Sequence, residues 1–155
     1  MILAVGSELT TGSTRDTNSG QLAAELHALG VEVLYATALP DRLERVRDAF
    51  EKALAEADLV VATGGLGPTP DDLTREAIAA ATGLELAVDA ELERWLRAIF
   101  RRRRLEMPEA NLKQAWLVPG ATALRNGQGT APGWWLELPD GRVIVALPGP
   151  PREMT

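Results

Sequence analysis

The 155-residue sequence contains no cysteine and a single histidine, His27. Such a chain can form neither a disulfide nor a zinc site built from thiolates or several histidines, and it lacks a Cys/His catalytic pair. His27 lies among the apolar positions Leu22, Leu26 and Leu29, which a helix is predicted to bury, so His27 itself is expected at the helix surface or boundary. Metal ligands in this chain are therefore expected to be oxygen atoms.

Long apolar runs and excess positive charge are also missing. No run of eighteen or more apolar residues occurs, which predicts no membrane-spanning helix. The opening MILAVGSELTTG has no basic leader and no cleavage site, and with the missing cysteines this favours the cytoplasm. Sixteen basic against 22 acidic side chains give a formal charge of −6. This balance argues against nucleic-acid and anionic-membrane partners and favours a small-molecule ligand.

What the chain does contain is an alternation of apolar strand patterns and amphipathic helix patterns. Strands are predicted over 2–5, 31–39, 58–63 and 116–118, with a hairpin over 134–147. Helices are predicted over 18–30, 41–57, 70–82, 89–104 and 107–115, and another begins near 148. Asp41 and Asp89 are expected N-caps. The order predicts one α/β domain over residues 1–155, with a mostly parallel sheet and an antiparallel hairpin, truncated within its last helix.

Three loops that follow predicted strands carry carboxylates. They are GSELTTGSTRDTN (6–18), GGLGPTPDD (64–72) and PGPPRE (148–153). Loops that leave the carboxyl ends of parallel strands gather at one edge of the sheet, where ligands bind at the reversal of strand order. Their acids are Glu8, Asp16, Asp71, Asp72 and Glu153. We expect these side chains to converge on one ligand site.

The glycine-rich loop ends in Asp71 and Asp72, and two interpretations of this pair stay open. In the structural one, Thr69 caps the next helix, Pro70 takes its first position, and both aspartates lie in its first turn, where the dipole favours anions. The glycines at 64–67 favour a functional one, because they let a ligand approach the backbone. A phosphate on this loop would then need a cation between itself and the carboxylates, and oxygen ligands select Mg²⁺, Mn²⁺ or Co²⁺.

Two further features have a structural interpretation that is favoured over a functional one. The Arg101–Arg104 run ends a predicted helix, where cations complement the dipole, so a solvated face is favoured over a phosphate or nucleic-acid site. Trp134 and Trp135 begin a strand and point to opposite faces. Burial of both is favoured over the stacking of one on a bound base.

Several of these segments together resemble one known family. GGLGPTPDDLTREA, MPEANLKQA, NGQGTAPGWW and LPGPPREM, with the earlier VGSELTTG and DTN, closely resemble the N-terminal domain of the CinA family (competence/damage-inducible protein A), in the molybdopterin-binding superfamily of MogA and MoeA. The resemblance implies a three-layer α/β/α sandwich that forms a homo-oligomer, a dimer or trimer. It also implies a metal-dependent pyrophosphatase acting on ADP-ribose or a related nucleotide diphosphate. The alternative is a non-catalytic domain that binds a pterin or a nucleotide.

The same resemblance assigns roles to residues of the loops. Asp71, Asp72 and Glu153 are the implied catalytic acids. Asp71, Asp72 and Glu8 would hold the divalent cation, Mg²⁺, Mn²⁺ or Co²⁺. The implied substrate-binding residues are Glu8, Asn18, Thr63, Gly64, Gly65, Gly67, Thr130, Gly149 and Pro150. The stretch SELTTGSTRDTN departs from the family, which usually has an apolar pair after the glutamate. The deamidase domain of many members is not in this sequence.

Overall fold

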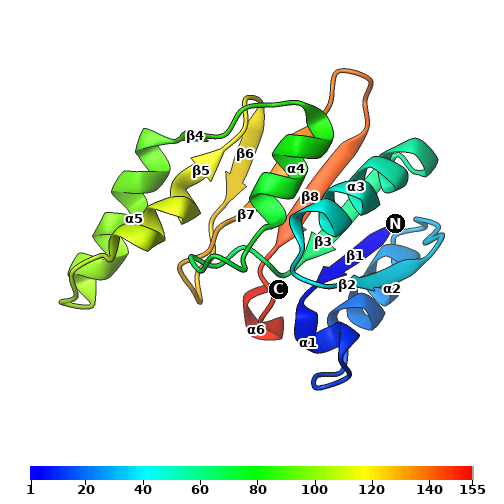
Figure 1. The fold of residues 1–155 in the computed structure, drawn as a ribbon, viewed down its shortest axis with the longest axis horizontal. Coiled ribbons are helices and arrows are strands. Elements are labelled where there is room, and N and C mark those ends of the chain that lie inside the picture. Colours follow the sequence, from blue (N-terminus) through cyan, green and yellow to red (C-terminus); the bar gives the residue numbers. More distant parts are fainter. Residues whose placement is uncertain (155) are drawn as a thin grey trace.

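The computed structural model describes residues 1–154 as an alternation of strands and helices (Figure 1). In chain order the elements are β1 (Ile2–Val5), α1 (Ser7–Thr10), α2 (Asn18–Ala28), β2 (Ala36–Leu39), α3 (Leu43–Glu56), β3 (Leu59–Thr63), α4 (Thr74–Thr82), β4 (Ala87–Val88), α5 (Ala90–Arg102), the 3₁₀-helix η1 (Glu109–Ala115), β5 (Trp116–Leu117), β6 (Ala121–Leu124), β7 (Gly133–Glu137), β8 (Val143–Leu147) and α6 (Pro151–Met154).

The central sheet has six strands in the order β2-β1-β3-β8-β7-β6. The first four are parallel to their neighbours, whereas β7 runs antiparallel to β8 and β6 antiparallel to β7. The chain leaves β1 for β2 on one side and returns to β3 on the other, so the strand order reverses at β1. The predicted mostly parallel sheet with a hairpin is confirmed. The sequence did not predict β6, nor β4, which pairs with β5 in a separate antiparallel sheet.

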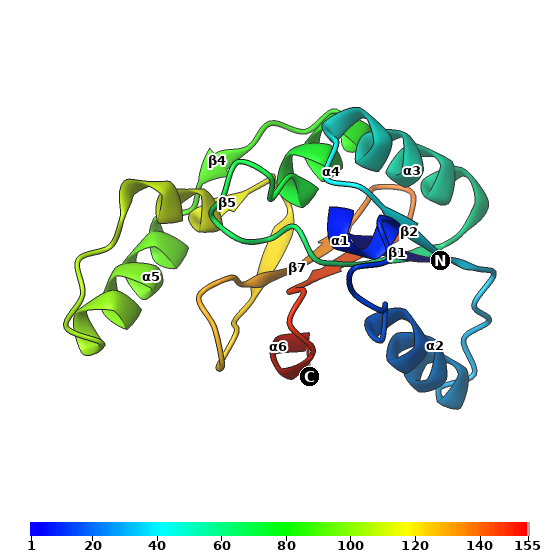
Figure 2. The ribbon, with the colours of Figure 1, turned by 60° about the horizontal axis from the view of Figure 1, so that its bottom comes forward.

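Helices cover both faces of the sheet. Figure 2 shows α3 and α4 on one face and α2 and α6 on the other, while α5 projects beyond the β6 edge. This arrangement confirms the three-layer α/β/α architecture. None of the helices within residues 1–154 is both long and apolar enough to cross a membrane.

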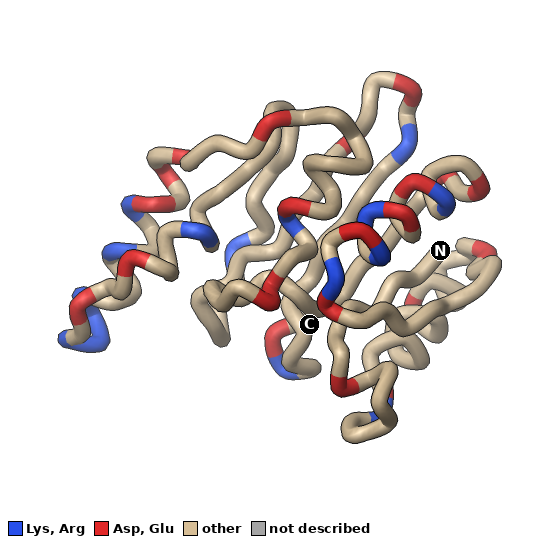
Figure 3. The backbone as a smooth tube through the Cα atoms, viewed as in Figure 1, with Lys and Arg blue, Asp and Glu red and all other residues tan. Residues whose placement is uncertain are grey.

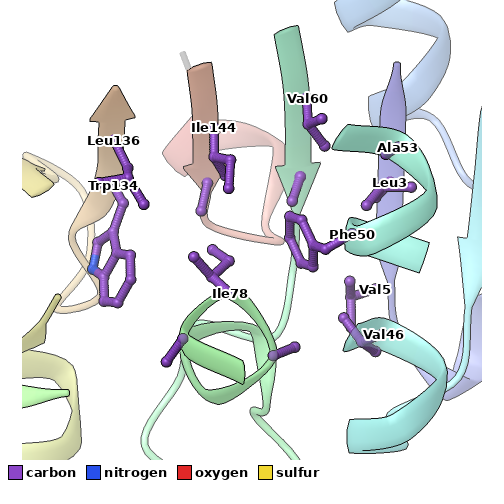
Figure 4. Close-up of a cluster of buried hydrophobic side chains, with 14 of the residues drawn as sticks. Leu3, Val5, Val46, Phe50, Ala53, Val60, Ile78, Trp134, Leu136 and Ile144 are labelled. Atoms are coloured by element: carbon purple, nitrogen blue, oxygen red, sulfur yellow. The ribbon is translucent and has the colours of Figure 1, made fainter. Parts of the chain in front are cut away.

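The main core lies between the sheet and the α3–α4 layer (Figure 4). Phe50 of α3 and Ile78 of α4 are fully buried against β-strand residues such as Ile144. β1 is buried along its whole length, as expected for a parallel strand with helices on both faces. Trp134 is also fully buried in this core, but Trp135 is 43% exposed, so the predicted burial of both tryptophans is wrong. Alternate strand residues point to opposite faces, and only one of them reaches this core.

Several element boundaries differ from the predicted ones. α4 begins at Thr74 rather than 70, so Asp71 and Asp72 precede the helix. Asp41 does not cap α3, whose N-cap is Arg42; the Asp41 carboxylate instead accepts a 2.7 Å hydrogen bond from the Ser7 amide. Asp89 does cap α5, accepting from the Leu92 amide at 2.7 Å.

The second predicted strand is confined to β2, and the helix before it buries fewer leucines than expected. Of 31–39, only Ala36–Leu39 pairs with β1. Leu22 and Leu26 of α2 are half-buried, but Leu29 at its end is 80% exposed. The burial predicted for Leu29 is therefore wrong, because the helix ends at Ala28 and Leu29 is its C-cap residue.

Candidate functional site

The loops after β1, β3 and β8 meet at one edge of the sheet around a cleft of about 770 Å³. Clefts that bind small molecules commonly measure about 300–1,000 Å³. The convergence expected from the parallel sheet is therefore present. The cleft is lined by every residue that the family resemblance singled out: Glu8, Asn18, Thr63, Gly64, Gly65, Gly67, Asp71, Asp72, Thr130, Gly149, Pro150 and Glu153.

Asn18 links the three loops that line the cleft. From the first turn of α2, its Nδ2 donates to Thr63 Oγ1 and to the carbonyl of Gly149, both at 2.8 Å. Thr63 at the end of β3 in turn donates to the Pro148 carbonyl at 3.1 Å. These bonds fix the loops after β1, β3 and β8 relative to one another, so Asn18 and Thr63 shape the cleft whatever ligand it takes.

The glycines of the 64–67 segment have contacts within the protein that require them. Gly64 has a φ of 92°, and a Cβ there would lie 2.1 Å from the Val5 carbonyl oxygen. A Cβ at Gly65 would lie 2.3 Å from Thr74 Oγ1, and one at Gly67 2.4 Å from Asp72 Oδ2. The sequence analysis explained these glycines by the close approach of a ligand. In the structure, the space beside them is occupied by neighbouring atoms of the protein itself.

The backbone amides of the same loop are only partly used. Gly64 N donates to the Leu147 carbonyl at 3.0 Å and Gly67 N to Asp72 Oδ1 at 2.8 Å. Within residues 1–154, the amides of Gly65 and Leu66 have no hydrogen-bond partner. Consecutive amides in a loop with left-handed residues form a concavity that accepts anions.

The two aspartates of the loop have different surroundings. Asp72 Oδ1 accepts from Gly67 N at 2.8 Å, and its Oδ2 accepts from Thr69 N at 2.9 Å and from Thr69 Oγ1 at 2.5 Å. Thr69 therefore does not cap α4, whose N-cap, Leu73, makes no side-chain cap bond; that prediction is wrong. Asp71 is exposed at the cleft and has no hydrogen bond or ion pair among the described residues. Asp72 thus closes the loop, whereas the Asp71 carboxylate stays available.

Two cations that the sequence analysis did not single out lie behind this loop. Lys113 of η1 donates to the carbonyls of Asp72 and Thr69, and it pairs with Glu76 at 2.7 Å. Arg75 is fully buried and donates from Nη1 to the Gly67 carbonyl at 3.4 Å. Burial lowers the pKa of Arg75 to about 10, although the charges of Glu76 and Asp72 act to raise it. Arg75 thus stays charged at neutral pH.

The buried amide side chain of Asn126 orders the 126–129 segment, part of which lines the cleft. Asn126 Oδ1 accepts from the amides of Gln128 and Gly129, each at 2.8 Å, and its Nδ2 donates to Glu153 Oε2 at 2.7 Å. A Cβ at Gly129 would lie 2.1 Å from the same Glu153 oxygen. Asn126 therefore holds Glu153 at the rim of the cleft, although α6 is only one turn long. No sequence pattern predicts this contact, because the two residues are 27 positions apart.

Residues 1–155 match the family described as "Probable molybdopterin binding domain". A CinA-like protein of Deinococcus deserti is 53% identical over 153 residues, which is 99% of this chain and 38% of that protein. The crystal structure of the protein CinA from Thermoplasma acidophilum, a protein of unknown function, matches with a TM-score of 0.92 at 33% identity, over 99% of this chain and 90% of that one. The chain belongs to the CinA family.

More distant structures share only the fold with this CinA-family chain. MoaB from Thermus thermophilus matches with a TM-score of 0.61 at 23% identity, over 99% of this chain and 84% of that one. The domain also spans only part of its curated relatives: a putative competence-damage inducible protein of Caldicellulosiruptor bescii is 44% identical, and the chain covers 37% of its length.

The implied metal ligands of this CinA-family domain do not form a ready-made coordination set. Among residues 1–154, no group of three or more Asp, Glu or His side chains is close enough to hold a metal ion. Glu8 instead folds back over Gly6, where a Cβ would lie 2.5 Å from Glu8 Oε1. Mg²⁺ is commonly bound by one or two carboxylates together with phosphate oxygens of the substrate. Asp71 and Glu8 both line the cleft and could contribute to such shared coordination, and the metal stays a prediction.

Proposed function

We propose that the cleft binds a phosphate-bearing small molecule, either a pterin or a nucleotide, with the phosphate on the glycine-rich loop. The observation that carries the proposal is the pair of unpartnered amides at Gly65 and Leu66, in a cleft of about 770 Å³. Amides held in this way bind phosphate without a basic side chain beside it. Arg75 and Lys113 lie behind the loop and add positive potential to a site whose rim carries Asp71 and Glu153.

The pterin is supported by the family description, molybdopterin binding, and by the cleft volume. The nucleotide is the related alternative, since both ligands combine a planar ring system with phosphate. The proposal places the protein in the cytoplasm, in keeping with a chain that has no cysteine. Binding itself needs no metal in this proposal, because the loop amides, the buried Arg75 and the half-buried Lys113 offset the charge of the phosphate.

Calorimetric titration with matched ligands tests this proposal. AMP and adenosine differ only by the phosphate, as do a phosphorylated pterin and its dephosphorylated form. We expect each phosphorylated ligand to bind at least about tenfold more tightly than its partner, because charge-assisted bonds to a phosphate contribute about 1.4 kcal/mol or more. Equal affinity within both pairs, or no binding of either phosphorylated ligand at millimolar concentration, would show that the loop is not a phosphate site.

A second candidate is the metal-dependent pyrophosphatase, favoured by the free carboxylate of Asp71 at the cleft. In that reaction, water attacks one phosphorus of ADP-ribose, the bridging P–O bond breaks, and AMP and ribose 5-phosphate are released. A divalent cation would neutralise the diphosphate. Asp71 would orient the ligand, and Asn18 and Thr63 would keep the loops in place.

Turnover separates this candidate from binding alone. AMP release from ADP-ribose is measured with Mg²⁺, Mn²⁺ or Co²⁺ and again after exhaustive chelation. The pyrophosphatase requires release that chelation abolishes and that Asp71→Asn lowers roughly 10²-fold. Tight binding of ADP-ribose with no AMP release under any of these metals would leave the domain as a binding module.

A further inference from the structure

A second, smaller hollow opens beside the main cleft. It measures about 260 Å³ and lies between the end of α5 and the 125–129 loop. Its wall includes Arg102 and Arg103 from the end of α5, Arg125 from the loop, and the side chain of Trp95. Arg103 also lines the main cleft, as does Gly129. We call this hollow the arginine groove; it adjoins the main cleft, with which it shares these two residues.

The arginine groove is basic in a chain whose formal charge is −6. Figure 3 shows the Lys and Arg positions gathered at the tip of α5, at the lower left of the molecule. Within residues 1–154, Arg102 and Arg103 make no ion pair and no side-chain hydrogen bond. Arg125 pairs with Glu91 at 2.5 Å, but both side chains are largely exposed, at 59% and 70%. Such a surface pair is weak and is readily exchanged for another anion.

The helix dipole explains only part of this charge. It accounts for Arg101 and Arg102, which lie in the last turn of α5. It does not account for Arg125, which follows β6 and reaches the same groove from a loop. Trp95 and Ile99 form an apolar wall next to these guanidinium groups, and an apolar wall strengthens a charge contact by lowering the local dielectric constant.

We propose that the arginine groove is a second phosphate subsite, which binds a further phosphate group of the ligand held in the main cleft. The proposal rests on the proposed function, since it assumes a first phosphate on the glycine-rich loop. Guanidinium groups suit this role, because their planar donors bind phosphate oxygens two at a time and stay charged at all physiological pH values. Arg103 borders both spaces, so it would contact the part of the ligand that links the two phosphates.

A titration with inorganic phosphate, followed by NMR at the arginine Nε–Hε signals, tests the groove by itself. We expect saturable shifts at Arg102 and Arg103, and about tenfold weaker phosphate binding in Arg103→Gln. Arg97→Gln is the matched control, because Arg97 lies on the same helix outside the groove and pairs with Glu93 at 2.8 Å. No saturable shift at millimolar phosphate, or equal shifts at Arg97 and Arg101, would overturn the proposal.

Ligand pairs test the link between the two spaces. Adenosine 3′,5′-bisphosphate is compared with AMP, and ADP-ribose 2′-phosphate with ADP-ribose. In at least one pair the extra phosphate is expected to increase affinity about tenfold, and Arg103→Gln is expected to remove that increase while Arg97→Gln retains it. If the extra phosphate increases the affinity in neither pair, the proposal that the two spaces bind one ligand is contradicted. If AMP or the phosphorylated pterin binds but inorganic phosphate shifts no arginine signal of the groove, the groove alone is refuted. If phosphate shifts these signals but neither AMP nor the phosphorylated pterin binds, the proposed function alone is refuted.

Discussion

Gly64 and Gly12 are two glycines with positive φ, of 92° and 77°, in different surroundings. A Cβ at Gly64 would lie 2.1 Å from the Val5 carbonyl oxygen, whereas one at Gly12 would have no atom within 4 Å. Alanine in the left-handed region costs about 1–2 kcal/mol, which is the whole expected loss for Gly12→Ala. We expect Gly64→Ala to cost more than about 3 kcal/mol, because a backbone atom must also move. Urea unfolding of both variants measures this; equal stabilities would show that the Val5 contact yields easily.

Asp71 and Asp72 offer a second matched pair at the residue scale. Asp72→Asn replaces an oxygen that accepts from Gly67 or Thr69 by an NH₂ group, and we expect a loss of about 1–2 kcal/mol in unfolding free energy. Asp71→Asn removes no contact made by the described residues and is expected to change stability by less than about 0.5 kcal/mol. The affinity for the ligand, in contrast, is expected to change in Asp71→Asn. Urea unfolding together with titration separates the two; equal stability losses would contradict the loop contacts of Asp72.

At the scale of elements, Lys113 joins three separate parts of the site. Its ammonium group on η1 contacts carbonyls of the loop before α4 and pairs with Glu76 of α4 at 2.7 Å, with side chains only 12% and 23% exposed. We expect Lys113→Gln and Glu76→Gln each to cost about 1–3 kcal/mol and to be non-additive by at least about 0.5 kcal/mol. A double-mutant cycle by urea unfolding measures the coupling. Arg97→Gln with Glu93→Gln, an exposed pair on α5, is the control and is expected to couple more weakly.

Elements that follow from a local sequence pattern were predicted, whereas elements that depend on contacts with distant segments were not. The buried strands and the meeting of three loops at one edge follow from local apolar patterns and from the rule for parallel sheets. β6 was missed because its sequence, ATAL, has little strand pattern and is ordered by pairing with β7. The start of α4 was misplaced because Thr69 and Asp72 bond each other instead of capping the helix.

The motif residues of the loops after β1, β3 and β8 line the cleft, as the sequence analysis predicts. Their roles in binding or catalysis stay predictions. Lys113, Arg75 and Asn126 were not identified, because each acts through a partner brought near only by tertiary folding. Arg103 was assigned to a solvated helix end, and its position between two hollows depends on the approach of the 125–129 loop.

At the scale of the whole molecule, the two faces of β7 have different environments. Trp134 is fully buried under the α3–α4 layer, and its neighbour Trp135 is 43% exposed on the opposite face. Trp135 pairs across the sheet with Val145 of β8, which is half-buried. Trp135 lines neither the main cleft nor the arginine groove. Aromatic residues, tryptophan among them, are enriched in contact surfaces between proteins.

A homo-oligomer, dimer or trimer, remains our prediction for the assembly, with Trp135 at the contact. A stable contact would bury about 800 Å² on each partner, and an exposed tryptophan is the kind of side chain that dominates such interfaces. We expect light scattering at tens of micromolar to give at least twice the 16.6 kDa chain mass, and Trp135→Ser to return the monomer mass. Leu29→Ser is the control, because Leu29 is 80% exposed on α2 and its loss is not expected to change the mass. A monomer mass for the unaltered chain would contradict the oligomer, and an oligomer that survives Trp135→Ser would place the contact on another face.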